Sequence, residues 1–158
     1  MDRLLRALDA LPGDEPVIAQ TGWCTYAPSR VTAEKLMPFE AIQAYMRDAR
    51  IVVTHGGPAS IMQALSHGKT PIVVPRQSAH GEHVDDHQVR FARRIAARVI
   101  VVEDPSELAE VIATYDARVR AIPPDAGGPA RARAFAQRFD TLCRALVARR
   151  GRVLTWRR

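Results

Sequence analysis

The sequence predicts an α/β fold built on a doubly wound parallel sheet, and three observations lead to that prediction. Apolar runs without alternation, "RIVV", "TPIVV" and "RVIVV", are typical of strands that are covered on both faces. Segments long enough for a helical crossover separate these runs. The chain has 158 residues, of which 47% are hydrophobic, and this is enough for one domain with a substantial core.

The first part of the chain supplies a helix, two strands and a second helix. "DRLLRALDAL" repeats leucine at a helical period, and Pro12-Gly13 ends that helix. The β-rich run "PVIAQT" stops at Gly22, and "RVTAEKL" predicts a further strand. Pro38 is suited to the first turn of the next helix, which "FEAIQAYMRDA" continues.

The rest of the chain continues the alternation of strands and helices. "ASIMQALSH" predicts a helix closed by Gly68, and residues 84–97 predict an amphipathic helix. Residues 104–107, "DPSE", have the composition of a helix start and precede "LAEVIATY". After the loop "IPPDAGGP", a long helix is expected from about Ala130 to Arg149.

Positive charge is concentrated near the C-terminus. The net charge is +6, and residues 117–158 hold 11 Arg and 2 acids, whereas residues 1–116 hold 12 basic and 15 acidic groups. Such a segment suits an acidic partner, an anionic membrane surface or nucleic acid, or it is simply a solvated Arg-rich helix. We expect one domain over residues 1–121, and over 122–158 a helix and basic tail that pack on the domain or on a partner.

Export and membrane signals are not expected. No apolar stretch approaches the roughly 20 residues that a membrane-spanning helix needs. The N-terminal segment "MDRLLRALDALPGDEP" does not resemble a signal peptide. Cys24 and Cys143 lie far apart without metal-type spacing, so we expect free thiols in a reducing compartment.

The stretch "THGGPASIMQALSHGK" joins a predicted strand to a predicted helix. Ligands of open parallel sheets lie beyond the carboxyl ends of the strands, where this stretch is expected. Gly56 and Gly57 lack a Cβ and allow a ligand to approach the backbone, and Pro58 shapes the loop.

The start of the helix after this loop predicts an anion site. The N–H groups of Ala59, Ser60 and Ile61 would be free at the helix N-terminus, and Ser60 adds a hydroxyl. A phosphate or diphosphate is the expected guest. The spacing matches neither G-x-G-x-x-G nor a Walker A sequence, so a tight strand-to-helix turn without a ligand remains an alternative.

A second polar cluster, "RQSAHGEHVDDHQ", occupies residues 76–88 after the next predicted strand. One interpretation is a metal-dependent hydrolase that uses His80, His83, Asp85 and His87. The other is a polar loop that hydrogen-bonds a hydroxyl-rich ligand without metal, and the absence of H-E-x-x-H or H-x-H-x-D-H favours it.

The two motifs together resemble a known family. "HGGPASIMQALSHGKTPIVVP" followed by "DDHQVRFA" is similar to the C-terminal domain of glycosyltransferase family 28. The resemblance covers roughly residues 1–115 and is strongest over 51–92. It is greatest to short bacterial exopolysaccharide subunits and to their relatives in dolichol-linked N-acetylglucosamine transfer. It implies a Rossmann-like domain, the C-terminal, donor-binding half of a GT-B glycosyltransferase.

The resemblance implies roles for residues of the first motif. His55, Gly56, Gly57 and Ser60 would face the nucleotide diphosphate. His55 would donate a hydrogen bond that stabilises the leaving group, or would only cap the loop. Gln63 stands where the family usually has Glu, whose carboxylate binds both ribose hydroxyls.

The resemblance also implies contacts with the sugar and the base. Asp85, Asp86 and Gln88 would meet the donor sugar, and residues near Met37–Phe39, Phe39 included, would flank the uracil. Related chains usually begin with a strand and a glycine loop before a segment like "FDRLV". This chain opens at "MDRLL", so the first strand and its loop are expected to be missing.

The implied activity is transfer of a hexosyl group from a UDP-sugar to a lipid-linked saccharide in polysaccharide biosynthesis. A separate membrane-anchored subunit would supply the acceptor domain, so we expect little activity from this chain alone. It would be cytoplasmic and peripheral at the inner face of the cell membrane through that partner, without metal, other cofactor or nucleic acid. The metal-dependent hydrolase and a non-catalytic module with a basic tail remain the alternatives.

Overall fold

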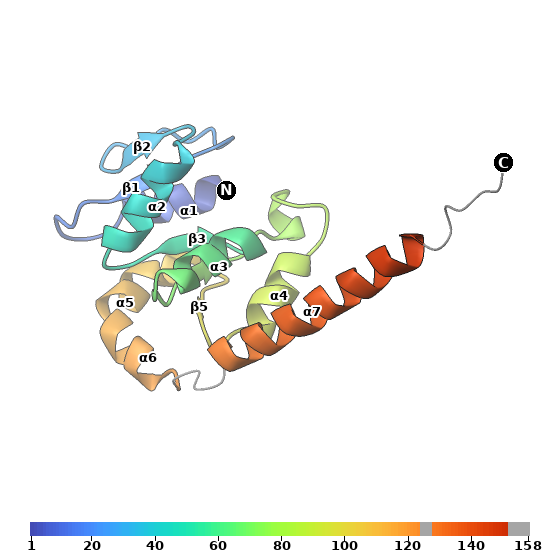
Figure 1. Cartoon of the computed structure of the whole chain (residues 1–158). Helices are drawn as coiled ribbons and strands as arrows, with labels where there is room; N and C mark the ends of the chain where they lie inside the picture. Colours follow the sequence, from blue (N-terminus) through green and yellow to red (C-terminus); the bar gives the residue numbers. More distant parts are fainter. Residues whose placement is uncertain (124–127, 152–158) are drawn as a thin grey trace. The chain divides into compact units, whose positions relative to one another are not determined.

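The computed structural model describes residues 1–123 and 128–151 (Figure 1). The chain divides into two compact units, Met1–Pro123 and Pro124–Arg158. The first unit contains all the described strands, and the described part of the second is the helix α7 (Gly128–Gly151). In the described residues, no helix is long and apolar enough to cross a membrane.

The first unit alternates helices and short strands along the chain, as the sequence predicts. Its elements are α1 (Asp2–Asp9), β1 (Ile18–Gln20), β2 (Thr32–Glu34), α2 (Phe39–Asp48), β3 (Val53–His55), α3 (Pro58–Ser66), β4 (Ile72–Val74), η1 (Ser78–His80), α4 (His87–Arg94), β5 (Ile100–Val101), η2 (Pro105–Glu107), α5 (Leu108–Ala113) and α6 (Tyr115–Ala121).

All strand pairs are parallel, and they form two sheets. β1 pairs with β2, and β3, β4 and β5 pair in that order. The register places Val53 opposite Ile72 and Ile72 opposite Ile100. Helices α2, α3 and α4 each connect two consecutive strands, so the crossovers have the pattern of a doubly wound sheet. The predicted fold class is therefore confirmed.

The hydrophobic core lies on both faces of the larger sheet. Ile72 and Val74 of β4 pack in a cluster with Leu8 of α1 and Leu108 of α5. Val73, between them, belongs to a second cluster with Ile61 of α3 and with α4 residues. Because alternate residues of a strand face opposite sides, β4 is buried on both faces, which explains its uninterrupted apolar sequence.

Two helices differ from the prediction. The amphipathic helix expected over residues 84–97 begins only at His87, because the Asp86 carboxylate accepts hydrogen bonds from the N–H and hydroxyl of Ser78 and holds the preceding residues as a loop. The helix expected over "LAEVIATY" divides at Thr114 into α5 and α6. The closing role of Gly68 agrees with its φ of +72°, a conformation that favours glycine.

Candidate functional site

A cavity of about 670 Å³ opens at the carboxyl edge of the strands. His55, Ser60 and Gln63, three of the predicted site residues, line it. The wall also includes Gln20, the last residue of β1, and Met37 and Arg76, which follow β2 and β4. This is the position at which open parallel sheets bind ligands.

The N-terminus of α3 offers two backbone donors beside this cavity. The first four positions of a helix have no intrahelical partner for their N–H groups, and here they are Gly57 to Ser60. Pro58 has no N–H, and the N–H of Gly57 donates to His55 Nδ1 at 2.9 Å. Ala59 and Ser60 remain. The prediction that Ile61 supplies a third free donor is wrong, because its N–H donates to the Gly57 carbonyl at 3.2 Å in the first helical turn.

His55 is held as a neutral hydrogen-bond donor. Its Nδ1 accepts from Gly57, so in the neutral ring the proton lies on Nε2. Burial, with a smaller contribution from the charge of Arg76, lowers the pKa of His55 below its ordinary value of 6.5. His55 therefore caps the loop with Nδ1, and this leaves the Nε2 proton for the second role that the sequence left open, so the two roles are compatible.

The two loop glycines are required by contacts within the protein. A Cβ on Gly57 would lie 2.2 Å from Cε1 of the His55 ring. A Cβ on Gly56 would lie 2.8 Å from the Gln88 Cβ and 3.1 Å from the Pro75 Cβ. The expected reason was approach of a ligand, but the structure shows that any side chain here would first displace the imidazole or separate β4 from α4.

Arg76 is a cation of the cavity wall that is not among the predicted site residues. It lines the cavity and is close enough to His55 to lower the pKa of that ring. The available signal was its position directly after the buried run "TPIVVP", where side chains reach the carboxyl edge. The guanidinium adds a charge-assisted donor for an anionic ligand.

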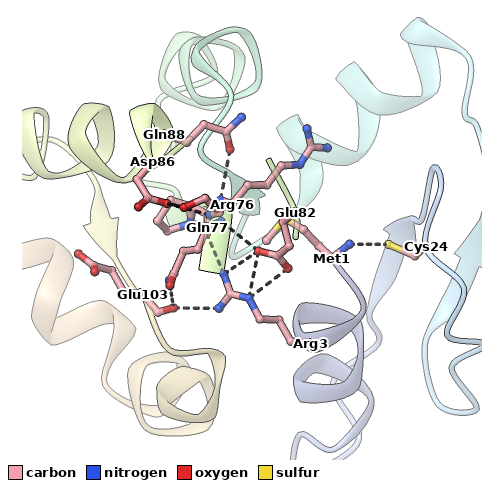
Figure 2. Close-up of polar contacts among 11 residues, drawn as sticks. Met1, Arg3, Cys24, Arg76, Gln77, Glu82, Asp86, Gln88 and Glu103 are labelled. Atoms are coloured by element: carbon pink, nitrogen blue, oxygen red, sulfur yellow. Dashed lines mark hydrogen bonds and ion pairs between the residues drawn. The ribbon is translucent and has the colours of Figure 1, made fainter. Parts of the chain in front are cut away.

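The loop after β4 is anchored by Arg3 of α1 (Figure 2). The guanidinium contacts both carboxylate oxygens of Glu82 at 3.1 Å and donates to the carbonyls of Pro75 and Glu103 at 2.8 and 2.9 Å. The Arg3 and Glu82 side chains are only 19% and 7% exposed. Gln77 joins the same group, because its side chain donates to the Glu103 carbonyl and its N–H donates to Glu82.

The residues expected to meet the donor sugar are engaged within the protein. Gln88 is 4% exposed, and its side-chain carbonyl accepts from the backbone N–H of Arg76 at 3.2 Å (Figure 2). Asp86 is bonded to Ser78, which lowers the pKa of its carboxyl. Asp85 is exposed and bonds His87 Nδ1 at 2.5 Å, and the pKa of its carboxyl is lowered by that bond. In this loop the cavity wall contains Arg76, Gly81 and Glu82 instead.

Three of the four residues of the predicted metal site, His83, Asp85 and His87, lie close together. Ligand atoms of His83, Asp85 and His87 lie within 4.8 Å of one another, and the two imidazoles meet edge to face at 4.4 Å between centroids. His80, the fourth residue of the predicted metal site, is outside this group. The three residues have the chemistry to hold a divalent cation.

Of the residues expected to flank the uracil base, Met37 lies in the cavity wall and Phe39 does not. Met37 lines the cavity, and its N–H donates to the Gln20 side chain at 2.8 Å. Phe39, at the start of α2, is 60% exposed and is not part of the wall described. Trp23 lies in the wall, is 89% exposed and carries Lys35 over its ring at 4.9 Å. Gln20 and Trp23 are not among the predicted site residues.

A doubly wound sheet with backbone donors at a helix start on its carboxyl edge defines a class of ligand-binding α/β domains. Comparison with protein families matches residues 8–124, more than half of the chain, to the glycosyltransferase family 28 C-terminal domain. The chain therefore belongs to this family, and its domain has the donor-binding role of a glycosyltransferase. Comparison with curated proteins and with solved structures found no match.

Proposed function

We propose that this chain binds a UDP-sugar and, with a partner subunit, transfers its hexosyl group to a lipid-linked saccharide in exopolysaccharide biosynthesis. One observation carries the donor site: His55, Ser60 and Arg76 line one cavity at the N-terminus of α3. Neutral N–H, hydroxyl and guanidinium donors at a helix start suit a diphosphate. Gln63 in the same wall is proposed for the ribose, and Met37 for the base.

In the proposed reaction, an acceptor hydroxyl oxygen bonds to the anomeric carbon as the bond to the diphosphate oxygen breaks. Negative charge grows on the departing diphosphate. Donors that are fixed before the reaction stabilise this charge without reorganisation. His55 meets that requirement, since its ring is held by the Gly57 N–H and stays neutral at pH 7. The acceptor proton passes to a general base, which we assign to the partner subunit.

The partner is proposed to dock on the C-terminal unit. Phe135, Phe139, Leu142 and Leu146 of α7 recur at spacings of four, three and four residues, and each is at least 55% exposed. Such a stripe on one helix face is typical of a seam for another helix. The predicted apolar contacts Val153, Leu154 and Trp156 lie outside the described residues. Peripheral attachment to the inner face of the cell membrane would follow from a membrane-anchored partner.

The test of the donor site is calorimetric titration of the full chain with UDP. Arg76→Met should weaken UDP binding by at least tenfold, because hydrogen bonds to charged groups contribute about 1.5–3 kcal/mol. Arg94→Met, which removes an exposed charge from α4, is the matched control and should leave affinity unchanged. Equal affinity of both variants would refute the assignment of the cavity.

The metal-dependent hydrolase is supported by the proximity of His83, Asp85 and His87. Family membership favours the transferase, and fixed donors at α3 provide charge stabilisation without a cation. Elemental analysis of the purified chain separates the two proposals. We expect less than stoichiometric zinc or manganese, whereas one tightly bound ion per chain would support the hydrolase.

A further inference from the structure

Three side chains of the loop after β4 converge away from the wall of the cavity at the carboxyl edge. His83, Asp85 and His87 offer ligand atoms that all lie within 4.8 Å of one another. Their side chains are 26%, 50% and 46% exposed. The cavity wall takes Gly81 and Glu82 from this loop but none of these three residues. A ligand in that cavity therefore does not explain their convergence.

The two imidazoles turn the same nitrogen toward one carboxylate oxygen. Asp85 Oδ1 lies 2.5 Å from Nδ1 of His87 and 3.8 Å from Nδ1 of His83. In a tetrahedral zinc site with bonds of about 2.0–2.1 Å, neighbouring ligand atoms are about 3.3 Å apart. The observed separations lie on either side of this value. Small rotations of exposed side chains would therefore bring all three atoms onto one ion.

The ligand set selects the class of metal. Two imidazoles and one carboxylate suit Zn²⁺ and its neighbours Ni²⁺ and Cu²⁺, whereas Mg²⁺ and Ca²⁺ prefer oxygen ligands. The neutral His87 ring can bind a metal through Nδ1 and keep its proton on Nε2. Nδ1 of His83 now accepts from the N–H of Val84 at 2.9 Å. Val84 is 93% exposed, so water can replace that acceptor at little cost.

An ion at this position would complete the fixing of the loop. Glu82 is held by Arg3, and Asp86 accepts from Ser78, so both ends of the stretch between them are anchored (Figure 2). Residues 81–86 form no helix or strand, and α4 begins at His87. An ion shared by residues 83, 85 and 87 would join the middle of the loop to the first residue of α4.

We propose that His83, Asp85 and His87 form a reversible Zn²⁺ site that fastens the loop after β4 to α4. The ion is structural and takes no part in sugar transfer, because its ligands are not in the cavity wall. Three exposed ligands with a fourth position open to water give a site that exchanges its metal. Purified chain therefore carries less than stoichiometric zinc, and the site does not rest on the proposed function.

Arg90 supplies a test of opposite sign. Its guanidinium lies 3.4 Å from Oδ2 of Asp85, the oxygen that does not face the histidines. This charge repels a cation bound to the same carboxylate. Arg90→Met should therefore tighten Zn²⁺ by about threefold at low salt, and the gain should shrink as salt is added.

The experiment is calorimetric titration of the full chain with ZnCl₂, after treatment with chelator and without a histidine tag. Wild type should bind one Zn²⁺ per chain. His87→Gln and Asp85→Asn should each weaken binding by at least tenfold. His80→Gln is the matched control, because His80 belongs to the same loop but not to the cluster, and it should bind as wild type does.

Thermal unfolding supplies a second measurement. An ion that binds only the folded chain raises the melting temperature with its concentration, and His87→Gln should abolish this rise whereas His80→Gln should keep it. The site is refuted if Zn²⁺ does not saturate at one per chain, or if the His87 and Asp85 variants bind as wild type does. A tenfold or larger change of UDP affinity with Zn²⁺ would place the ion in the cavity and overturn its structural role. If UDP does not bind at all, the proposed function fails and the zinc result stands.

Discussion

The loop after β3 and the loop after β4 leave the same sheet at the same edge, but different interactions hold them. The first is fixed within its own few residues by His55, two glycines and Pro58. The second is held by Arg3, which reaches it from a position 79 residues before Glu82. The cavity at the carboxyl edge of the strands therefore has one wall, the loop after β3, that is locally determined, and another, the loop after β4, that depends on the packing of α1.

The largest expected effect is a loss of stability when the loop after β4 is released from Arg3. Arg3→Met leaves the Glu82 carboxylate, 7% exposed, without its cationic partner and with the Gln77 N–H as its remaining donor, and it removes a donor from two carbonyls. Loss of one member of a buried pair costs about 3–5 kcal/mol, and urea unfolding should show a loss near the lower figure. The control Arg47→Met, from an ion pair that is more than 60% exposed, should cost less than about 1 kcal/mol. Similar losses in both variants would contradict the anchoring role.

The contrast between the loops also explains what the sequence could predict. Buried strands and crossover helices follow from local patterns such as "RIVVTHGGP", and these predictions hold in the structure. The anion site at α3 stays a prediction, and within it the N–H of Ile61 is already paired. The anchoring of Glu82 by Arg3 depends on residues far apart in the chain, and no local pattern records it. The family resemblance placed Gln88 at the donor sugar, but no local pattern shows that this side chain is buried against Gly56.

A substitution in the loop after β3 should affect UDP affinity more than the free energy of unfolding. Gly57→Ala would place a methyl group against the His55 ring, displace the imidazole and break its bond to the loop. UDP affinity should fall about tenfold, or 1.4 kcal/mol, in calorimetry. Gly56→Ala, whose methyl would meet Pro75 and Gln88, should mainly lower the free energy of unfolding.

The double variant His55→Ala/Gly57→Ala shows whether the ring is the cause. If the clash is responsible, Gly57→Ala should cost little more once the imidazole is gone, so the two effects on affinity should not add. Fully additive losses would mean that the methyl group blocks the ligand directly, as the sequence alone implies.

A substitution at Gln63 should raise UDP affinity rather than lower it. A carboxylate accepts from two ribose hydroxyls more strongly than an amide, so Gln63→Glu should tighten UDP by on the order of 1 kcal/mol. The gain should shrink for 2′-deoxy UDP, which lacks one hydroxyl. Unchanged binding, or an equal gain for both nucleotides, would place the ribose elsewhere in the cavity.

The smallest effect expected is a pH dependence of the free energy of unfolding that originates in His55, in the loop after β3. The folded protein lowers the pKa of His55 below 6.5, mainly by burial, so the unfolded chain takes up this proton at a higher pH. Stability should therefore be unaffected by His55 well above pH 6.5 and should fall as the pH drops below it. His55→Gln removes this contribution, and urea unfolding at several pH values from 7.5 to 5 should give it a shallower decline than wild type. Parallel declines would show that the ring titrates as in the unfolded chain, and that the loop after β3 does not hold it neutral.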